Sequence, residues 1–166
     1  MLPQPNPPTH RVIYVLDSSV LIDIKNGYPI NNPLFSGIWQ SMAEMATDGR
    51  LISPHEAFRE LRKGMDEAAE WAAVHKHMFV EMDQEQASIV TEIWTKCPEI
   101  DKDIARPHAD PWCVALAIRH QRSTGSAAYV VSNENKKSPR KIPVICDKFA
   151  VQCIKMLEFF MHLSRH

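Results

Sequence analysis

The chain has 166 residues, of which 45% are hydrophobic and 23% are charged, with a formal net charge of −1. This composition is typical of a globular protein with its own core and excludes an intrinsically disordered chain. No apolar run approaches the roughly 18 residues that span a membrane. A net charge near zero excludes a general attraction to nucleic acid, so any RNA binding would have to come from local basic patches.

The N-terminal residues and the cysteines indicate further properties of the chain. Residues 1–10 are polar and proline-rich, which predicts a flexible N-terminal arm rather than a signal peptide, followed by one domain over residues 11–166. The four cysteines have no C-x-x-C spacing and lie in apolar segments, so we expect reduced thiols in a cytoplasmic protein. They are Cys97, Cys113, Cys146 and Cys153.

The first half of the chain begins with a β-branched apolar run at residues 11–16, which predicts a strand buried on both faces. A short helix, a loop rich in proline and asparagine, a longer helix that Gly49 stops, and a short strand follow. Their ranges are 20–25, 27–33, 34–47 and 51–53. Residues 53–56 have the form of a capping box with proline at the first helical position, which predicts a helix to about Lys63, ended by Gly64.

In the second half, helices are predicted at 66–77 and 84–96, with a short strand at 79–82 between them. A strongly apolar helix follows at 112–120, then buried strands at 127–132 and 142–146, and an amphipathic helix at 154–163. Strands that alternate with helices predict an α/β protein with a parallel sheet flanked by helices.

Four acidic residues stand at informative places. Asp17 follows the first strand, Glu60 lies on the helix after the second, Asp110 opens the apolar helix, and Glu134 follows the strand at 127–132. Ligands of open α/β sheets bind at the carboxyl ends of the strands, where these side chains could converge. Grouped carboxylates repel one another unless a cation binds, and Mg²⁺ or Mn²⁺ prefers oxygen ligands. Such an ion can activate water for phosphodiester hydrolysis.

Each of these acids also has a structural interpretation. Asp17 and Asp110 could cap the helices that follow them. Glu60 could be solvated or could pair with a neighbouring basic residue, and Glu134 could be a polar loop residue. Three further acids are left out of the predicted site: Glu56 because the capping box explains it, Asp23 as an exposed helix residue, and Asp147 as a cap of the turn after residues 142–146.

Together these segments resemble the motifs of PIN domains. Residues 14–22 (YVLDSSVLI) resemble the first motif, a strand followed by D-[ST]-[ST]-V-L-I, and residues 60–64 resemble the second, E-L-x-x-G. Residues 109–117 resemble the third, an aspartate before an apolar helix. Residues 131–134 (VSNE) resemble the fourth, in which an aspartate usually stands where this chain has Glu134. The motifs occur in the family's order.

The resemblance implies a three-layer α/β/α sandwich around a mainly parallel sheet, and a metal-dependent endoribonuclease that uses Mg²⁺ or Mn²⁺. The phrases RELRKG, ADPWCVALA and KIPVICDKF look closest to the VapC-type toxins of toxin–antitoxin pairs, which implies an RNA substrate, a homodimer and a cognate antitoxin protein. By position, the catalytic metal ligands would be Asp17, Glu60, Asp110 and Glu134. The residues supporting them through hydroxyl or amide groups would be Ser19, Ser132 and Asn133.

Basic side chains near the acids could contact phosphates of the RNA. They are Arg59 and Lys63 on the helix of Glu60, and Lys136, Lys137 and Arg140 after Glu134. Arg62, Lys141, Arg106 and His108 lie in the same regions. The structural interpretation of all of them is a solvated surface.

Two other functions are compatible with these residues. The replacement at position 134 leaves open a PIN-like module that binds RNA or protein without cleaving it. The residues D-S-S-V after a strand also resemble the nucleophile loop of haloacid-dehalogenase phosphatases, with Asp17 as nucleophile. That family usually has a second aspartate where this chain has Ser19.

Overall fold

The computed structural model describes residues 11–100, 110–138 and 140–165; the predicted arm at residues 1–10, together with Arg106 and His108, lies outside this range. The described chain forms a five-stranded sheet of order β3-β2-β1-β4-β5 in which every pairing is parallel. The strands are β1 (Ile13–Leu16), β2 (Leu51–Pro54), β3 (Phe79–Val80), β4 (Ala128–Val131) and β5 (Gln152–Ile154). The predicted parallel sheet is therefore confirmed.

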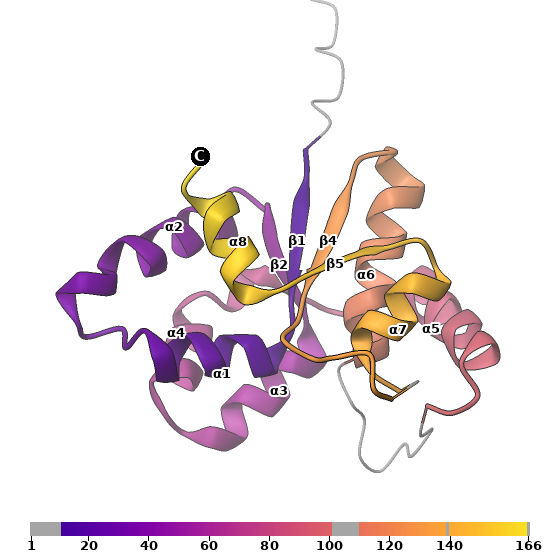
Figure 1. The fold of residues 1–166 in the computed structure, drawn as a ribbon, viewed down its shortest axis with the longest axis horizontal. Helices are drawn as coiled ribbons and strands as arrows, with labels where there is room; N and C mark the ends of the chain where they lie inside the picture. Colours follow the sequence, from indigo (N-terminus) through magenta and orange to yellow (C-terminus); the bar gives the residue numbers. More distant parts are fainter. Residues whose placement is uncertain (1–10, 101–109, 139, 166) are drawn as a thin grey trace, which may run out of the picture.

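Helices cover both faces of the sheet, which gives the three layers of an α/β/α sandwich (Figure 1). One layer contains α1 (Ser18–Gly27), α2 (Ser36–Thr47), α3 (His55–Gly64), α4 (Glu67–Val74) and α8 (Met156–Leu163). The other contains α5 (Gln84–Lys96), α6 (Asp110–Thr124) and α7 (Ile142–Lys148). Two short 3₁₀ turns lie at Pro33–Phe35 and Lys76–Met78.

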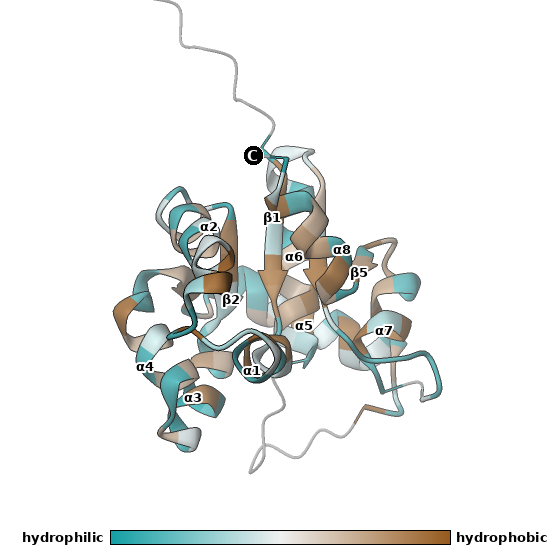
Figure 2. Cartoon of the chain, turned by 60° about the vertical axis from the view of Figure 1, so that its left-hand side comes forward, coloured by the Kyte–Doolittle hydropathy of each residue, from teal (hydrophilic) through white to brown (hydrophobic). Residues whose placement is uncertain are grey.

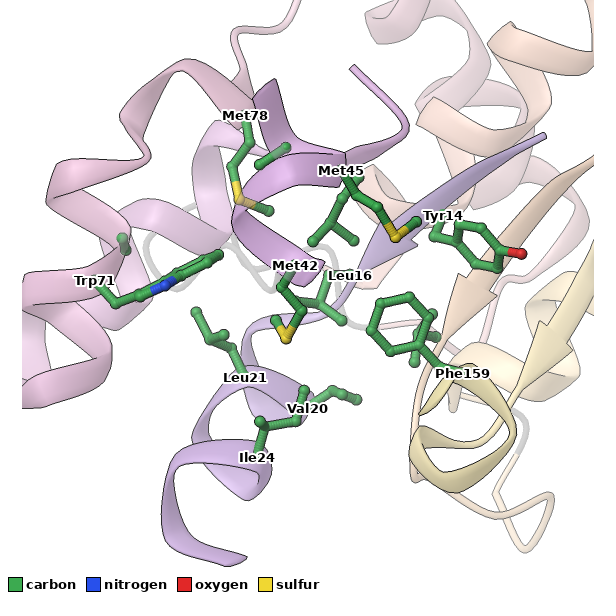
Figure 3. Close-up of a cluster of buried hydrophobic side chains, with 14 of the residues drawn as sticks. Tyr14, Leu16, Val20, Leu21, Ile24, Met42, Met45, Trp71, Met78 and Phe159 are labelled. Carbon is green, nitrogen blue, oxygen red and sulfur yellow. The ribbon is translucent and has the colours of Figure 1, made fainter. Parts of the chain in front are cut away.

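The alternation of side chains along β1 builds two cores, one on each face. Tyr14 and Leu16 pack into the first cluster with α1, α2 and α8, whereas Ile13 and Val15 pack against α5 and α6. Figure 3 shows the first cluster, in which Leu16, Met42 and Phe159 are almost fully buried. Each such side chain contributes roughly 1.5–3 kcal/mol through its burial. In Figure 2 hydrophobic residues follow the strands, whereas the loop between β4 and α7 is mostly hydrophilic.

The carboxyl ends of three neighbouring strands, β1, β4 and β5, are level with one another. Leu16 pairs with Val131, and Val131 pairs with Ile154. The backbone N–H of Asp17 donates to the Val131 carbonyl at 3.4 Å, which holds the residue after β1 beside the end of β4. The chain leaves β1 toward β2 on one side and returns with β4 on the other, so this edge is the switch point at which α/β sheets bind ligands.

The segment at residues 142–146 is a helix, α7, and the prediction of a strand there is wrong. Pro143 occupies the first turn of α7, where its missing N–H costs nothing. The fifth strand is formed by Gln152–Ile154 instead, so α8 begins only at Met156. Asp147 accordingly lies in α7, where it pairs with Lys136 at 2.6 Å.

The predicted capping box at residues 53–56 is also absent. Strand β2 continues through Pro54, and the Ser53 hydroxyl donates to the Leu16 carbonyl at 2.6 Å, which ties the end of β2 to the end of β1. No side chain caps α3 at Pro54. None of the helices in the described part of the chain has the length and apolar character that crossing a membrane requires.

Candidate functional site

A pocket of about 360 Å³ brings together the four acids that the sequence singled out. Asp17 comes directly after β1, and Glu134 comes three residues after the end of β4. Glu60 projects from α3, and Asp110 is the first residue of α6. Four segments far apart in the chain thus contribute one carboxylate each to the pocket at the carboxyl edge of the sheet.

Two serines at the start of α1 hold two of the carboxylates. The Ser19 hydroxyl donates a hydrogen bond to Asp17 Oδ2, and the Ser18 hydroxyl donates to Glu60 Oε2. Asp17 is 3% exposed, and its side chain does not cap α1, although its backbone carbonyl accepts from Val20 N–H. Ser18 was not among the predicted site residues; its only signal in the sequence is its place beside Asp17.

The acids are close enough to perturb one another electrostatically. Burial, followed by the charges of Glu134 and Glu60, raises the pKa of Asp17 to about 6, against the opposing hydrogen bond from Ser19. Burial, followed by the charges of Asp17, Glu134 and Glu60, raises the pKa of Asp110 to about 8. Burial first, and the neighbouring negative charges second, disfavour the ionised carboxylates, and a cation bound among them would offset both effects.

Glu134 differs from the other acids in its partners. Its Oε2 accepts a hydrogen bond from the backbone N–H of Ile142 at 2.9 Å, and its Oε1 accepts from Lys141 Nζ at 3.2 Å. Both oxygens of this carboxylate are therefore already engaged at the start of α7.

The predicted supporting residues after β4 turn to other partners. The buried Ser132 hydroxyl accepts from the Glu134 backbone N–H at 3.2 Å. The Asn133 amide donates to Asp23 Oδ2 at 2.8 Å and accepts from Met156 N–H at 3.0 Å. Asn133 thus joins α1 to the start of α8, whereas Ser132 fixes the backbone that carries Glu134.

The predicted basic residues lie in three different settings. Arg59 and Lys63 are exposed on α3, and Lys137 is exposed in the loop before α7. Lys136 is held by Asp147, whereas Arg140 lines the acidic pocket. Lys141 also lines the pocket, although it was noted from the sequence only as one of several basic residues in this loop.

A fifth acid lies on the same helix as Glu60. Glu56 precedes Glu60 by one helical turn and is 9% exposed, and its Oε2 has no hydrogen-bond partner among the described residues. Burial, followed by the charges of Asp17, Asp110, Glu60 and Glu56, raises the pKa of the Cys113 thiol well above its usual value. In the sequence, the apparent capping box explained Glu56 as a structural residue, so Glu56 was not predicted to lie near the other acids.

The donor chemistry of the pocket fits a hard divalent cation. Asp17, Glu60 and Asp110 offer only oxygen ligands, which suit Mg²⁺ or Mn²⁺, and none of the described residues that line the pocket carries a thiol or an imidazole. Within the described ranges, no three acidic, histidine or cysteine side chains are already closed around one ion position.

Comparison with known proteins gives one family. Neither the curated proteins nor the solved structures contain a match to this chain. Residues 14–166 match the family described as a domain of unknown function (DUF4411), and this match covers all four pocket acids and the described helices and strands apart from Ile13, the first residue of β1. The chain belongs to the DUF4411 family.

Proposed function

We propose that the protein is a metal-dependent endoribonuclease that hydrolyses phosphodiester bonds of RNA. The observation that supports this most directly is the convergence of Asp17, Glu60, Asp110 and Glu134 on one pocket at the switch point of the sheet. The resemblance of the same four segments to PIN-domain motifs supports the reaction type and an RNA substrate.

In this proposal Asp17, Glu60 and Asp110 hold Mg²⁺ or Mn²⁺, and Glu134 lines the same pocket. The chemistry that such an ion supplies when bound is activation of water and stabilisation of charge on a phosphoryl oxygen. Ser18 and Ser19 orient two of the carboxylates, and the burial of Asp17 keeps bulk water away from that side of the pocket. Arg140, exposed at the rim, is available to a phosphate of the bound strand.

The test is cleavage of total cellular RNA, which offers tRNA, rRNA and mRNA together. We expect cleavage with Mg²⁺ or Mn²⁺, its loss in EDTA, and a decrease on the order of 10²-fold or more in Asp17→Asn and Asp110→Asn. Asp48→Asn is the matched control, because Asp48 is exposed at the end of α2 and pairs with Arg50. Cleavage that survives EDTA would refute the proposed mechanism.

A second candidate is a module that binds RNA without cleaving it. The engagement of both Glu134 oxygens favours it, because one of the four acids is then less free to bind an ion. RNA binding that persists in Asp17→Asn, in a protein that cleaves nothing under any metal condition, would identify this alternative.

The resemblance to the toxin subgroup supports a biological setting for the proposed enzyme. In that setting the protein acts in the cytoplasm as a homodimer, and a cognate antitoxin protein inhibits it. The four free thiols fit the reducing cytoplasm. Expression without a partner gene should slow growth of the host, and the Asp17→Asn variant should not.

A further inference from the structure

The contacts of Glu134 join the acidic pocket to the start of α7. Lys141, which precedes α7, offers no capping side chain, so the first N–H of the helix depends on an acceptor from elsewhere. Glu134 provides that acceptor through Oε2, which receives the Ile142 N–H at 2.9 Å. The other oxygen, Oε1, receives Lys141 Nζ at 3.2 Å. One carboxylate therefore fixes both the helix and the side chain of the preceding lysine.

The length of the residue at position 134 matters for this arrangement. An aspartate is one methylene shorter and, on the same backbone, would not span the distance to Ile142 N–H and Lys141 Nζ together. The replacement that makes the fourth motif unusual among PIN-like sequences therefore has a structural consequence in this chain. It places the carboxylate at the start of α7, on the Ile142 N–H and on Lys141 Nζ.

Lys141 is thereby held at the acidic pocket. It lines the pocket together with Asp17, Glu60 and Asp110, and its positive charge opposes the rise in the pKa of Asp110. The side chain of Lys141 is 47% exposed, whereas that of Glu134 is 19% exposed. The ammonium is thus anchored on its protein side and open on its solvent side.

We propose that Lys141 binds the scissile phosphate of the substrate and that Glu134 is a positioning residue for this lysine rather than a metal ligand. An ammonium has three N–H donors, so one can stay on Glu134 while the others reach phosphoryl oxygens. The charge on Glu134 is already matched by that of Lys141, and the cation is left to Asp17, Glu60 and Asp110. This inference rests on the proposed nuclease function.

Binding of Mn²⁺ alone, measured by calorimetry without RNA, separates a ligand from a positioning residue. We expect Glu134→Gln to keep the Mn²⁺ dissociation constant within about threefold of the wild type, because its amide oxygen still faces α7. Asp110→Asn should weaken Mn²⁺ binding by tenfold or more. Lys141→Met should leave Mn²⁺ binding unchanged or make it tighter, because a neighbouring positive charge is removed. Equal losses in Glu134→Gln and Asp110→Asn would overturn the inference and make Glu134 a ligand.

Cleavage of the best RNA substrate then tests the role of the lysine. We expect Lys141→Met to lower kcat on the order of 10²-fold, and Lys141→Arg to restore part of it. Glu134→Asp should lower kcat in the same way, although aspartate is the usual residue of the motif. Lys148→Met is the control, since Lys148 is an exposed lysine on α7 that pairs with Glu99. Thermal melts establish that each variant is folded.

The outcomes separate this inference from the proposed function. A wild type that neither binds Mn²⁺ nor cleaves RNA would refute the nuclease itself. A wild type that does both, with Lys141→Met indistinguishable from Lys148→Met, would refute only the role of Lys141. Higher activity in Glu134→Asp would show that the shorter acid is the better ligand and would also overturn the inference.

Discussion

At the scale of single residues, the most unusual side chain outside the pocket is Gln86. It is 0% exposed, and neither Oε1 nor Nε2 has a hydrogen-bond partner within the described residues. A buried amide without partners costs about 1–3 kcal/mol relative to one that stays hydrated. Gln86 lies in the first turn of α5, whose N-terminus is capped by Asp83 through the Gln86 backbone N–H at 2.9 Å.

We therefore expect Gln86→Met to raise the free energy of unfolding by about 1–2 kcal/mol, because methionine has a similar length and no buried polar group. Urea denaturation measures this directly. Gln84→Met, an exposed position on the same helix, should change stability by no more than about 0.5 kcal/mol. A loss of stability in Gln86→Met would show that the amide makes stabilising hydrogen bonds and would contradict this interpretation.

At the scale of elements, Asp66 joins two helices of the same layer. Its Oδ1 accepts the Ala69 N–H at 3.1 Å and caps α4, while its Oδ2 accepts Lys25 Nζ from α1 at 2.7 Å. The hydrogen bond from Lys25, followed by that from Ala69, lowers the pKa of Asp66. One carboxylate thus satisfies a helix terminus and holds α1, which carries Ser18 and Ser19, against α4.

We expect Asp66→Ala to destabilise the protein by about 1–2 kcal/mol, the usual cost of losing an N-cap. Asp66→Asn keeps the capping oxygen and loses only a partly exposed ion pair, so it should cost less than about 1 kcal/mol. Chemical denaturation of both variants, with Asp48→Ala as an exposed control, measures the difference. If the asparagine variant were as unstable as the alanine variant, the link to α1 would matter more than the cap.

The elements also show which parts of the fold the sequence could predict. Residues 84–96 were predicted as a helix and form α5, because their apolar spacing has the helical period and Asp83 provides a cap. Residues 142–146 are apolar throughout and only five residues long, so periodicity cannot separate a strand from a helix. A contact from Glu134, distant in sequence, satisfies the first N–H of α7, and no local pattern reports it.

The same limit applies to the candidate site. The positions of Asp17 and Glu134 after strands predicted that they would meet if the strand order allowed it, since the ends of parallel strands share one edge, and β1 and β4 are in fact neighbours. The partners of Glu134 depend on where α7 begins, and those of Asn133 depend on where α8 begins. Residues 142–146 were predicted as a strand rather than a helix, and the predicted start of α8 lay two residues before Met156. The acids could be found from strand ends, and their hydrogen bonds could not.

At the scale of the whole molecule, the grouped acids should make stability depend on pH. The pKa of Asp17 rises from 3.8 to about 6 on folding, and that of Asp110 rises from 3.8 to about 8. Between about pH 4 and about pH 8 the folded protein therefore binds more protons than the unfolded chain. The free energy of unfolding therefore falls as pH rises from about 4 to about 8, and below about pH 4 the two carboxyls have no effect.

For the metal-free protein we expect a melting temperature roughly 5–10 °C lower at about pH 8.5 than at about pH 5.5, since the change in free energy is of the order of 3 kcal/mol. Differential scanning calorimetry in EDTA measures it. Asp110→Asn removes the carboxyl with the larger rise in pKa, so its melting temperature should fall by less than half as much over the same range. Asp48→Asn should behave like the wild type.

Addition of Mg²⁺ should oppose the loss of stability at high pH. A cation binds the ionised carboxylates, so at low pH it must compete with protons for them. At high pH the carboxylates are ionised, and their mutual repulsion favours binding of the cation. The increase in melting temperature caused by Mg²⁺ should therefore be larger at about pH 8.5 than at about pH 5.5, and it should be lost in Asp110→Asn. A Mg²⁺ effect that is equal at both pH values, or that survives in Asp110→Asn, would place the ion elsewhere on the molecule. Because this measurement needs no RNA, it tests the metal site independently of the reaction and of the substrate.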